Sequence, residues 1–192
     1  MNFDDLNPPY IELPPHYVWY RIQRLKARFD SVRTRGFVLA PPGPLSGRFD
    51  LFDEPTAYLA DTELTALYES LFRREVRSCH LDQVKARALV TFRTKDRLRL
   101  VDLRGLEERY PVLQSLRYET TQAFATSCRQ GGAHGIIYAS AQHSTHACIC
   151  LFPEGVARMV RSANTPLVQP GTERLHRSVV LAARGSEVPI IQ

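Results

Sequence analysis

The chain lacks any long hydrophobic run. No stretch of its 192 residues approaches the roughly 18 consecutive apolar residues that a membrane-spanning helix requires. The N-terminus, MNFDDLNPPYIELPPHY, is acidic and interrupted by proline, and it has neither the basic nor the apolar segment of a secretory signal. We therefore expect a cytoplasmic protein.

Cysteine and glycine-rich signatures are scarce as well. The four cysteines are too few and too irregularly spaced for a disulfide framework, which agrees with a reducing compartment: Cys79, Cys128, Cys148 and Cys150. Neither a G-x-G-x-x-G nor a G-x-x-x-x-G-K-[ST] pattern is present, so the two common phosphate-loop architectures are excluded. Ser140 does not lie in a G-x-S-x-G turn, so serine-hydrolase chemistry has little support.

The segment from His143 to Cys150 contains histidines and cysteines, the residue types that bind zinc. In a β-strand, however, Cys148, Cys150 and Phe152 share one face and form a small hydrophobic row. No second pair of closely spaced ligands completes a tetrahedral site. We expect no metal here, and the sequence shows neither the partner base nor the lowered pKa that a cysteine nucleophile needs.

The composition is that of an ordinary folded domain, with 44% hydrophobic and 23% charged residues. The net charge of +5 permits a nucleic-acid partner without requiring one. Basic residues form two clusters: Arg21, Arg24, Lys26, Arg28, Arg33 and Arg35, then Arg93, Lys95, Arg97 and Arg99. No DNA- or RNA-reading motif accompanies them, so we interpret them as a solvated surface. A basic nucleic-acid-binding module without catalysis is the alternative from another functional class.

Short strands and short helices alternate along the chain, which favours an α+β domain. Residues 1–15 contain four prolines and are interpreted as an arm that lies on the surface or reaches a partner, and residues 30–46 as a loop. Strands are expected at Tyr17–Ile22, Ala57–Ala60, Gly135–Ser140, His146–Phe152 and Ser178–Ala183, and as a pair within residues 86–103 joined by the turn Thr94–Asp96. Short helices are expected at Gly105–Leu116 and Glu119–Cys128.

A further helix is expected to begin at Asp61 or Thr62 and to continue past Glu69. Its apolar residues have the i, i+3, i+4 spacing of one buried stripe: Leu64, Leu67, Tyr68, Leu71 and Phe72. Glu69 then lies well inside the helix, roughly 130° from the centre of that stripe, on a face of small and polar residues. That position is typical of a carboxylate lining a cleft, although a surface ion pair with Arg73 would also account for it.

Three more side chains are candidates for a functional site. Arg21 comes near the end of a strand, Arg48 follows the proline-rich loop, and Tyr58 lies within a strand. Each has an ordinary structural explanation, a salt bridge for the arginines and half-burial for the tyrosine. Taken with Glu69 and Ser140 they indicate a site for a small anionic ligand, because guanidinium groups bind anions through paired hydrogen bonds.

The order of these motifs closely resembles the RES domain family. The chain carries YRI, then GRFD, AYLADTELTALYE, GIIYAS and LFP, so the resemblance runs over about residues 17–152. The portion from GRFD to ALYE is its specific part. Matched residue by residue, the family's arginine, glutamate and serine correspond to Arg21, Glu69 and Ser140, its GRF arginine to Arg48, and its strand tyrosine to Tyr58.

The resemblance implies a fold similar to that of ADP-ribosyltransferases, a single α+β domain over residues 16–192 with a small, split mixed or antiparallel sheet flanked by short helices. It implies the toxin of a type II toxin–antitoxin system, an NAD⁺-consuming pentosyltransferase that cleaves the nicotinamide–ribose bond and passes ADP-ribose to phosphate or water. Mono-ADP-ribosylation of a cellular protein is the alternative. Glu69, Arg21 and Ser140 would be catalytic, and these three with Arg48 and Tyr58 would bind NAD⁺ as a substrate, without a prosthetic group.

The partner that the resemblance implies is an antitoxin with a helix-turn-helix DNA-binding part and a segment that occludes the active site. The resemblance allows a homodimer within that complex, and it implies neither membrane binding nor direct nucleic-acid binding by this chain. The chain departs from many relatives in its proline-rich loop between Arg21 and Arg48 and in its N-terminal arm. These departures bear on the acceptor of ADP-ribose more than on the NAD⁺ site.

Overall fold

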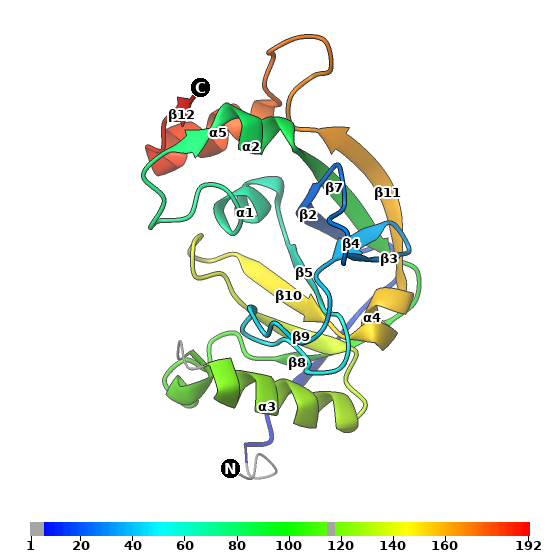
Figure 1. The fold of residues 1–192 in the computed structure, drawn as a ribbon. Coiled ribbons are helices and arrows are strands. Elements are labelled where there is room, and N and C mark those ends of the chain that lie inside the picture. Colours follow the sequence, from blue (N-terminus) through cyan, green and yellow to red (C-terminus); the bar gives the residue numbers. More distant parts are fainter. Residues whose placement is uncertain (1–5, 115–117) are drawn as a thin grey trace.

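The computed structural model describes residues 6–114 and 118–192, and its centre is an eight-stranded sheet with the strand order β1-β8-β9-β10-β5-β2-β7-β11 (Figure 1). All neighbours in it are antiparallel except β8 and β9. Its strands are β1 (Tyr10–Leu13), β2 (Val18–Arg24), β5 (Ala57–Ala60), β7 (Arg87–Thr94), β8 (Leu98–Asp102), β9 (Gly135–Ala139), β10 (Ala147–Leu151) and β11 (Met159–Pro166). Two small sheets pair β3 (Val32–Thr34) with β4 (Phe37–Leu39), and β6 (Cys79–His80) with β12 (Ile190–Ile191).

The large sheet is split between β5 and β2. These two strands share a single residue pair, Tyr20 with Ala60, whereas β2 pairs with β7 along its whole length. The connections from β1 to β2 and from β7 to β8 both cross this split. The predicted strands within residues 86–103 therefore exist as β7 and β8, but the prediction that they pair with each other is wrong, because β8 lies between β1 and β9.

Helices cover the sheet at three places. They are α1 (Glu63–Tyr68), α2 (Leu81–Lys85), α3 (Tyr118–Gln130), α4 (Pro153–Ala157) and α5 (Arg177–Ser186), with a 3₁₀ turn at Pro111–Gln114. One core packs α3 against β9 and β10, and a second packs α1 against α5. A third core lies under the β3–β4 hairpin, where the rings of Phe37 and Phe92 stack at 3.8 Å. The predicted α+β class and split mixed sheet are confirmed.

Helix α1 is shorter than predicted. Thr62 is its N-cap, as expected, since its hydroxyl accepts from the backbone N–H of Thr65 at 3.1 Å. The helix ends at Tyr68, so the prediction that Glu69 lies well inside it is wrong; Glu69 is the C-cap residue. The apolar stripe misled the prediction, because Leu71 and Phe72 are buried as expected but reach the core through a turn, in which both backbone N–H groups donate to the carbonyl of Leu67.

Several other predictions fail for local reasons. Ser178–Ala183 is not a strand but part of α5. Its two valines favour β-structure and misled the prediction. The helix forms because His176 caps it and because its Val179 and Ala182 are buried. Residues 30–46 are not simply a loop, since they contain the β3–β4 hairpin, whose turn residues Arg35 and Gly36 both have positive φ.

Two expected segments are only partly regular. Gly105–Leu116 was expected to be helical, but up to residue 114 it forms only the 3₁₀ turn, and residues 115 and 116 lie outside the described residues. Of the proposed arm over residues 1–15, Tyr10–Leu13 belongs to the sheet as edge strand β1, and residues 1–5 are likewise outside the described part. The remaining expected strands and the helix at Glu119–Cys128 are confirmed within one or two residues at most boundaries.

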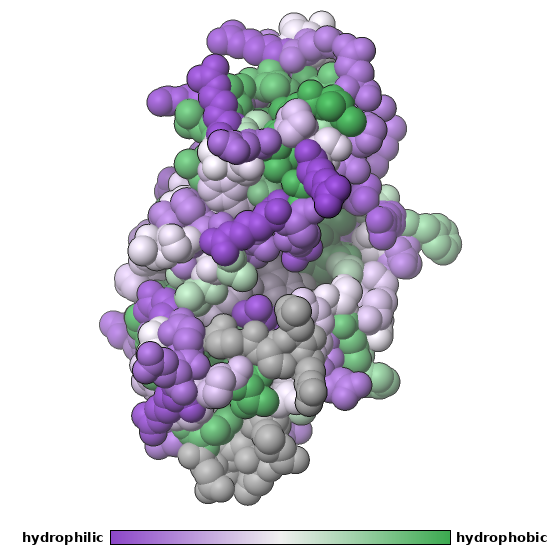
Figure 2. Space-filling view, turned by 90° about the vertical axis from the view of Figure 1, so that its left-hand side faces the viewer, coloured by the Kyte–Doolittle hydropathy of each residue, from purple (hydrophilic) through white to green (hydrophobic). Residues whose placement is uncertain are grey.

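The face of the molecule drawn in Figure 2 is mainly hydrophilic. Figure 2 shows the left-hand side of Figure 1, on which hydrophobic side chains occur in small groups between polar ones. Among the residues described, no helix has the length and apolar character needed to cross a bilayer.

Candidate functional site

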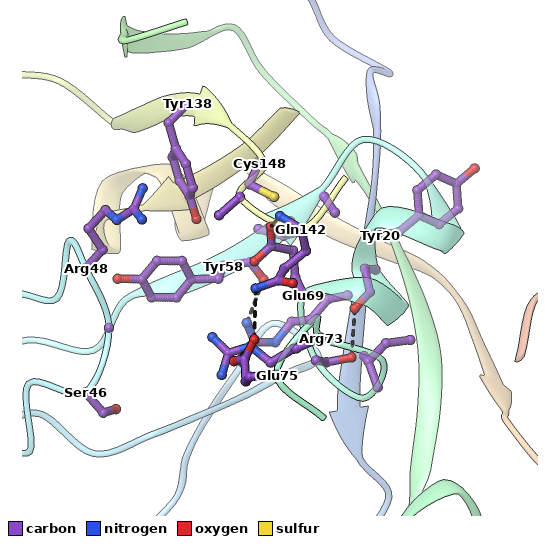
Figure 3. Close-up of a pocket in the computed structure, with 18 of the residues that line it drawn as sticks. Tyr20, Ser46, Arg48, Tyr58, Glu69, Arg73, Glu75, Tyr138, Gln142 and Cys148 are labelled. Atoms are coloured by element: carbon purple, nitrogen blue, oxygen red, sulfur yellow. Dashed lines mark hydrogen bonds and ion pairs between the residues drawn. The ribbon is translucent and has the colours of Figure 1, made fainter. Parts of the chain in front are cut away.

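A cavity of about 620 Å³ lies where β2 and β5 diverge, within the size range of small-molecule sites. Four of the five predicted site residues line it, namely Arg21, Arg48, Tyr58 and Glu69. Its charged lining consists of three arginines and two glutamates: Arg21, Arg48, Arg73, Glu69 and Glu75. Figure 3 shows Arg48 on the loop before β5, Tyr58 on β5 itself and Glu69 at the end of α1.

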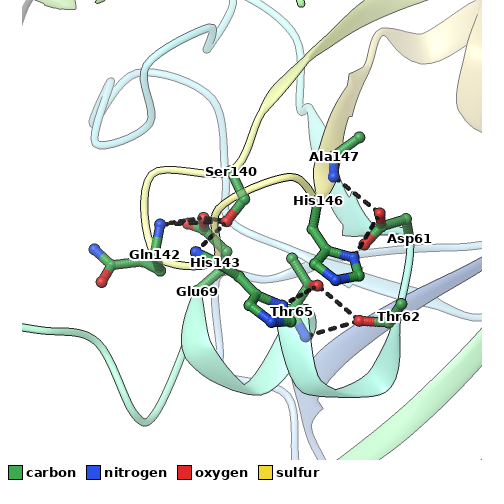
Figure 4. Close-up of polar contacts among 9 residues, drawn as sticks. All are labelled: Asp61, Thr62, Thr65, Glu69, Ser140, Gln142, His143, His146 and Ala147. Atoms are coloured by element: carbon green, nitrogen blue, oxygen red, sulfur yellow. Dashed lines mark hydrogen bonds and ion pairs between the residues drawn. The ribbon is translucent and has the colours of Figure 1, made fainter.

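Glu69 is held in place by Ser140, the fifth predicted residue. The hydroxyl of Ser140 donates to Oε1 of Glu69 at 2.5 Å, and the backbone N–H of Gln142 donates to the same oxygen at 3.3 Å (Figure 4). The Ser140 oxygen also accepts from the backbone N–H groups of Gln142 and His143. Ser140 is buried and does not line the cavity, so it orients the carboxylate and closes its own loop.

The loop that follows Ser140 is fixed to the start of α1. Nδ1 of His143 lies 2.8 Å from Oγ1 of Thr65, and Nδ1 of His146 lies 3.0 Å from Oδ2 of Asp61. The two imidazole rings stack with centroids 4.0 Å apart. The histidines therefore brace the loop that carries Ser140, a role that sequence reasoning missed because it considered them only as metal ligands.

The cysteines have the surroundings of a hydrophobic core. All four are buried, and burial raises the pKa of Cys148 and Cys150 far above the ordinary value of a thiol. Cys150 and Phe152 belong to the same core cluster, as the alternation predicted, whereas Cys148 lies in a neighbouring cluster and contacts the cavity. Within residues 6–114 and 118–192, no group of three His, Cys, Asp or Glu side chains is arranged to hold a metal ion.

Arg21 spans the split in the sheet. Its Nη1 donates to the carbonyl of Tyr58 at 2.6 Å and its Nη2 to that of Val38 at 3.5 Å. The guanidinium thus hydrogen-bonds the carbonyl of Tyr58 in β5, which a paired strand would otherwise have done. Burial lowers the pKa of Arg21 to about 10, and the group remains a cation at neutral pH. No carboxylate among the described residues forms an ion pair with it.

The loop that carries Arg48 is held by hydrogen bonds from α3. The carbonyl of Arg48 accepts from the hydroxyl of Thr121, and the carbonyl of Gly47 accepts from Nε2 of Gln122 at 2.9 Å. Its guanidinium lies over the ring of Tyr138, 5.9 Å from the centroid, and it too lacks a carboxylate partner among the residues described (Figure 3). The side chain is therefore available to an anion in the cavity.

Tyr58 holds the loop that carries Arg48 through hydrogen bonds of its hydroxyl. Its hydroxyl donates to Oδ1 of Asp50 at 2.9 Å and accepts from the backbone N–H of Phe49 at 2.9 Å, which leaves the ring to line the cavity. A Cβ on Gly47 would lie 2.5 Å from both the Tyr58 hydroxyl and Oδ1 of Asp50, so only glycine fits there. Burial raises the pKa of Tyr58 well above its ordinary value, and the phenol stays neutral.

Sequence reasoning missed several cavity residues, among them Tyr138, Arg73 and Gln142. Tyr138 precedes Ser140 by two positions in the same strand run, so the alternation of side chains could have revealed it. Arg73 was considered only as a partner for Glu69, but its Nε forms an ion pair with Glu75 at 3.3 Å. Gln142 gave no signal, because its place depends on the fold of its loop.

Comparisons with known proteins identify the family and the fold. The model of the RES domain family matches residues 18–172. Among solved structures, a chain of the M. tuberculosis MbcT–MbcA toxin–antitoxin complex has a TM-score of 0.58 and 17% sequence identity, over 81% of this chain and 86% of that chain. A comparison with curated proteins finds no match. Because the family match spans most of the sequence, this chain belongs to the RES domain family.

Proposed function

We propose that the protein is the toxin of a type II toxin–antitoxin pair and that it cleaves the nicotinamide–ribose bond of NAD⁺. The observation that carries this proposal is the oriented carboxylate of Glu69 in a cavity that also holds two arginines without carboxylate partners among the described residues. NAD⁺ matches that arrangement, since it offers an anionic pyrophosphate next to a ribose whose bond to a cationic base must break.

Each residue then has a distinct task. Loss of nicotinamide leaves positive charge on the ribosyl carbon, as in glycoside hydrolysis, and the Glu69 carboxylate stabilises that charge. Ser140 holds the Glu69 carboxylate in position for the ribose through its 2.5 Å hydrogen bond to Oε1. Arg21 and Arg48 bind the pyrophosphate oxygens, and the ring of Tyr58 forms an apolar wall for the nicotinamide. The ADP-ribosyl group passes to phosphate or water, and nicotinamide leaves as a neutral base.

Nicotinamide release from NAD⁺ tests the proposal directly. The wild type should release nicotinamide, and Glu69→Gln, which keeps the shape and removes the charge, should be slower by about 10²–10³-fold. Glu108→Gln is the matched control, because Glu108 is exposed and does not line the cavity. Equal rates for the wild type and Glu69→Gln would contradict the proposal.

The acceptor and the partner need separate measurements. With labelled NAD⁺, soluble ADP-ribose or its 1″-phosphate supports the proposed transfer, whereas label on a cellular protein band supports mono-ADP-ribosylation instead. The solved relative is part of a toxin–antitoxin complex, and we propose a cognate antitoxin that covers the cavity. Growth arrest on expression of this chain, reversed by co-expression of such an antitoxin, is the expected result; unimpaired growth with active enzyme would contradict the toxin assignment.

A further inference from the structure

A second concave region of about 520 Å³ lies between the end of β2, the β3–β4 hairpin and β11. It shares no lining residue with the NAD⁺ cavity. Every charged side chain that lines it is a cation: Arg24, Lys26, Arg33, Arg35 and Arg161. We call these five residues and the space between them the basic groove. Four of its cations come from the first basic cluster of the sequence, and Arg161 joins them from far along the chain.

The walls of the basic groove are fixed. Gln23 joins the hairpin to β2, since its Nε2 donates to the carbonyl of Gly36 at 3.1 Å and its Oε1 accepts from the backbone N–H of Val38 at 3.2 Å. Gly36 has a φ of +87°, and a Cβ there would lie 2.9 Å from Cβ of Arg161. The stem of Arg161 thus packs directly on the turn, beside which β11 runs in Figure 1.

The charge of the groove is not neutralised within the chain. In the part of the chain that the structure describes, none of its five cations forms an ion pair. Arg87 pairs with Arg24 across β2 and β7. The pKa of Arg87 is lowered first by burial and then by the positive charges of Arg24 and Arg28. Like charges gathered without counter-charge repel one another, so an anionic partner would stabilise this region.

We propose that the basic groove binds single-stranded nucleic acid through its phosphate backbone. Four of the five cations are arginines, whose forked guanidinium matches a phosphate. Phe29, in the loop that leaves the groove, is fully exposed, and Leu25 is 46% exposed. An exposed ring beside a cationic groove provides a stacking surface for a base. The proposal departs from the expectation that this chain makes no direct nucleic-acid contact.

The test is anisotropy of a labelled oligonucleotide of about 12 nucleotides at graded salt, with the full chain. The wild type should bind with a log K against log salt slope of about −3, as expected for four or five neutralised phosphates of a single strand. The double variant Arg33→Glu with Arg35→Glu should bind at least about tenfold more weakly with a shallower slope. Arg77→Glu with Arg174→Glu changes the net charge equally at exposed positions outside the groove and should keep the slope.

Phe29→Ala gives an independent test, because removing an exposed ring leaves the fold intact. Loss of one stacked base should weaken binding by about fivefold or more. A flat salt response of the wild type, equal losses in groove and control variants, tighter binding of a duplex, or tighter binding of a poly-glutamate peptide would each overturn the proposal. The groove variants should be at least as stable to heat as the wild type and should release nicotinamide at the same rate, so the result does not depend on the NAD⁺ proposal.

Discussion

The NAD⁺ cavity and the basic groove both present arginines, but they hold them in opposite ways. In the cavity, Arg21 is half-buried and anchored on two carbonyls, and Arg48 is carried by a loop whose carbonyls are hydrogen-bonded. In the groove, Arg33 and Arg35 are exposed on a hairpin. Anchored cations recognise one geometry, whereas exposed cations supply charge that salt screens. The two regions should therefore differ in their response to substitution, to salt and to pH.

The largest effect should come from the carboxylate that distinguishes the cavity from the groove. Glu69→Gln should reduce nicotinamide release by about 10²–10³-fold, because it removes charge stabilisation of the transition state. Ser140→Ala should reduce it less, by about tenfold, since the carboxylate remains but loses one charge-assisted hydrogen bond. Initial rates measure both. A loss for Ser140→Ala as large as that for Glu69→Gln would mean that the serine does more than orient its neighbour.

Arg48 tests whether anchoring gives geometric recognition. Arg48→Lys keeps the charge but loses the fork, and we expect KM for NAD⁺ to rise by about tenfold with a smaller change in kcat. Arg109→Ala is the matched control, because Arg109 also lies over a tyrosine ring, at 5.2 Å from the centroid, but outside the cavity. An unchanged KM for Arg48→Lys would show that the charge alone suffices in the cavity.

Gly47 tests the rigidity of the loop that carries Arg48. Gly47→Ala forces a Cβ to within 2.5 Å of the Tyr58 hydroxyl and should cost about 1–3 kcal/mol of unfolding free energy. Nicotinamide release should fall with it, because the loop must shift. Gly131→Ala is the control, since the nearest heavy atom to a Cβ there is 3.4 Å away. Denaturant unfolding of both variants measures the difference; equal stabilities would contradict the close packing described for the loop.

The sequence predicted the components of the site better than their arrangement. Four of the five predicted residues line one cavity: Arg21, Arg48, Tyr58 and Glu69. They could be found from the sequence because strand and cap signals are local and a family motif fixes the order of the residues. The role of Ser140 could not be read locally, since its hydrogen-bonding partner Glu69 lies 71 residues away. The pairing of β8 with β1 and β9 depends on the split sheet, which no local pattern encodes. The basic groove was hidden for the same reason, because Arg161 reaches it only through the position of β11.

The smallest effect concerns pH and the loop that braces Glu69. Burial, and then the neighbouring His146, lower the pKa of His143 below its ordinary value, against a weaker opposing pull from Asp61. Below pH of about 6.5 the unfolded chain takes up a proton at this position while the folded chain resists it. The stability that neutral His143 contributes is therefore present above that pH and is lost as pH falls through the folded-state pKa.

Thermal unfolding at pH about 7.5 and about 5.5 should show this as a drop in Tm that His143→Asn reduces. His80→Asn is the control, because His80 is exposed and makes no side-chain capping bond to α2. Nicotinamide release should fall over the same interval, since the backbone N–H of His143 donates to the Ser140 oxygen that orients Glu69. Oligonucleotide binding at the groove should lack this dependence, because no histidine lines the groove. Parallel losses at both regions would mean that acid acts on the whole fold rather than on the loop that distinguishes the cavity.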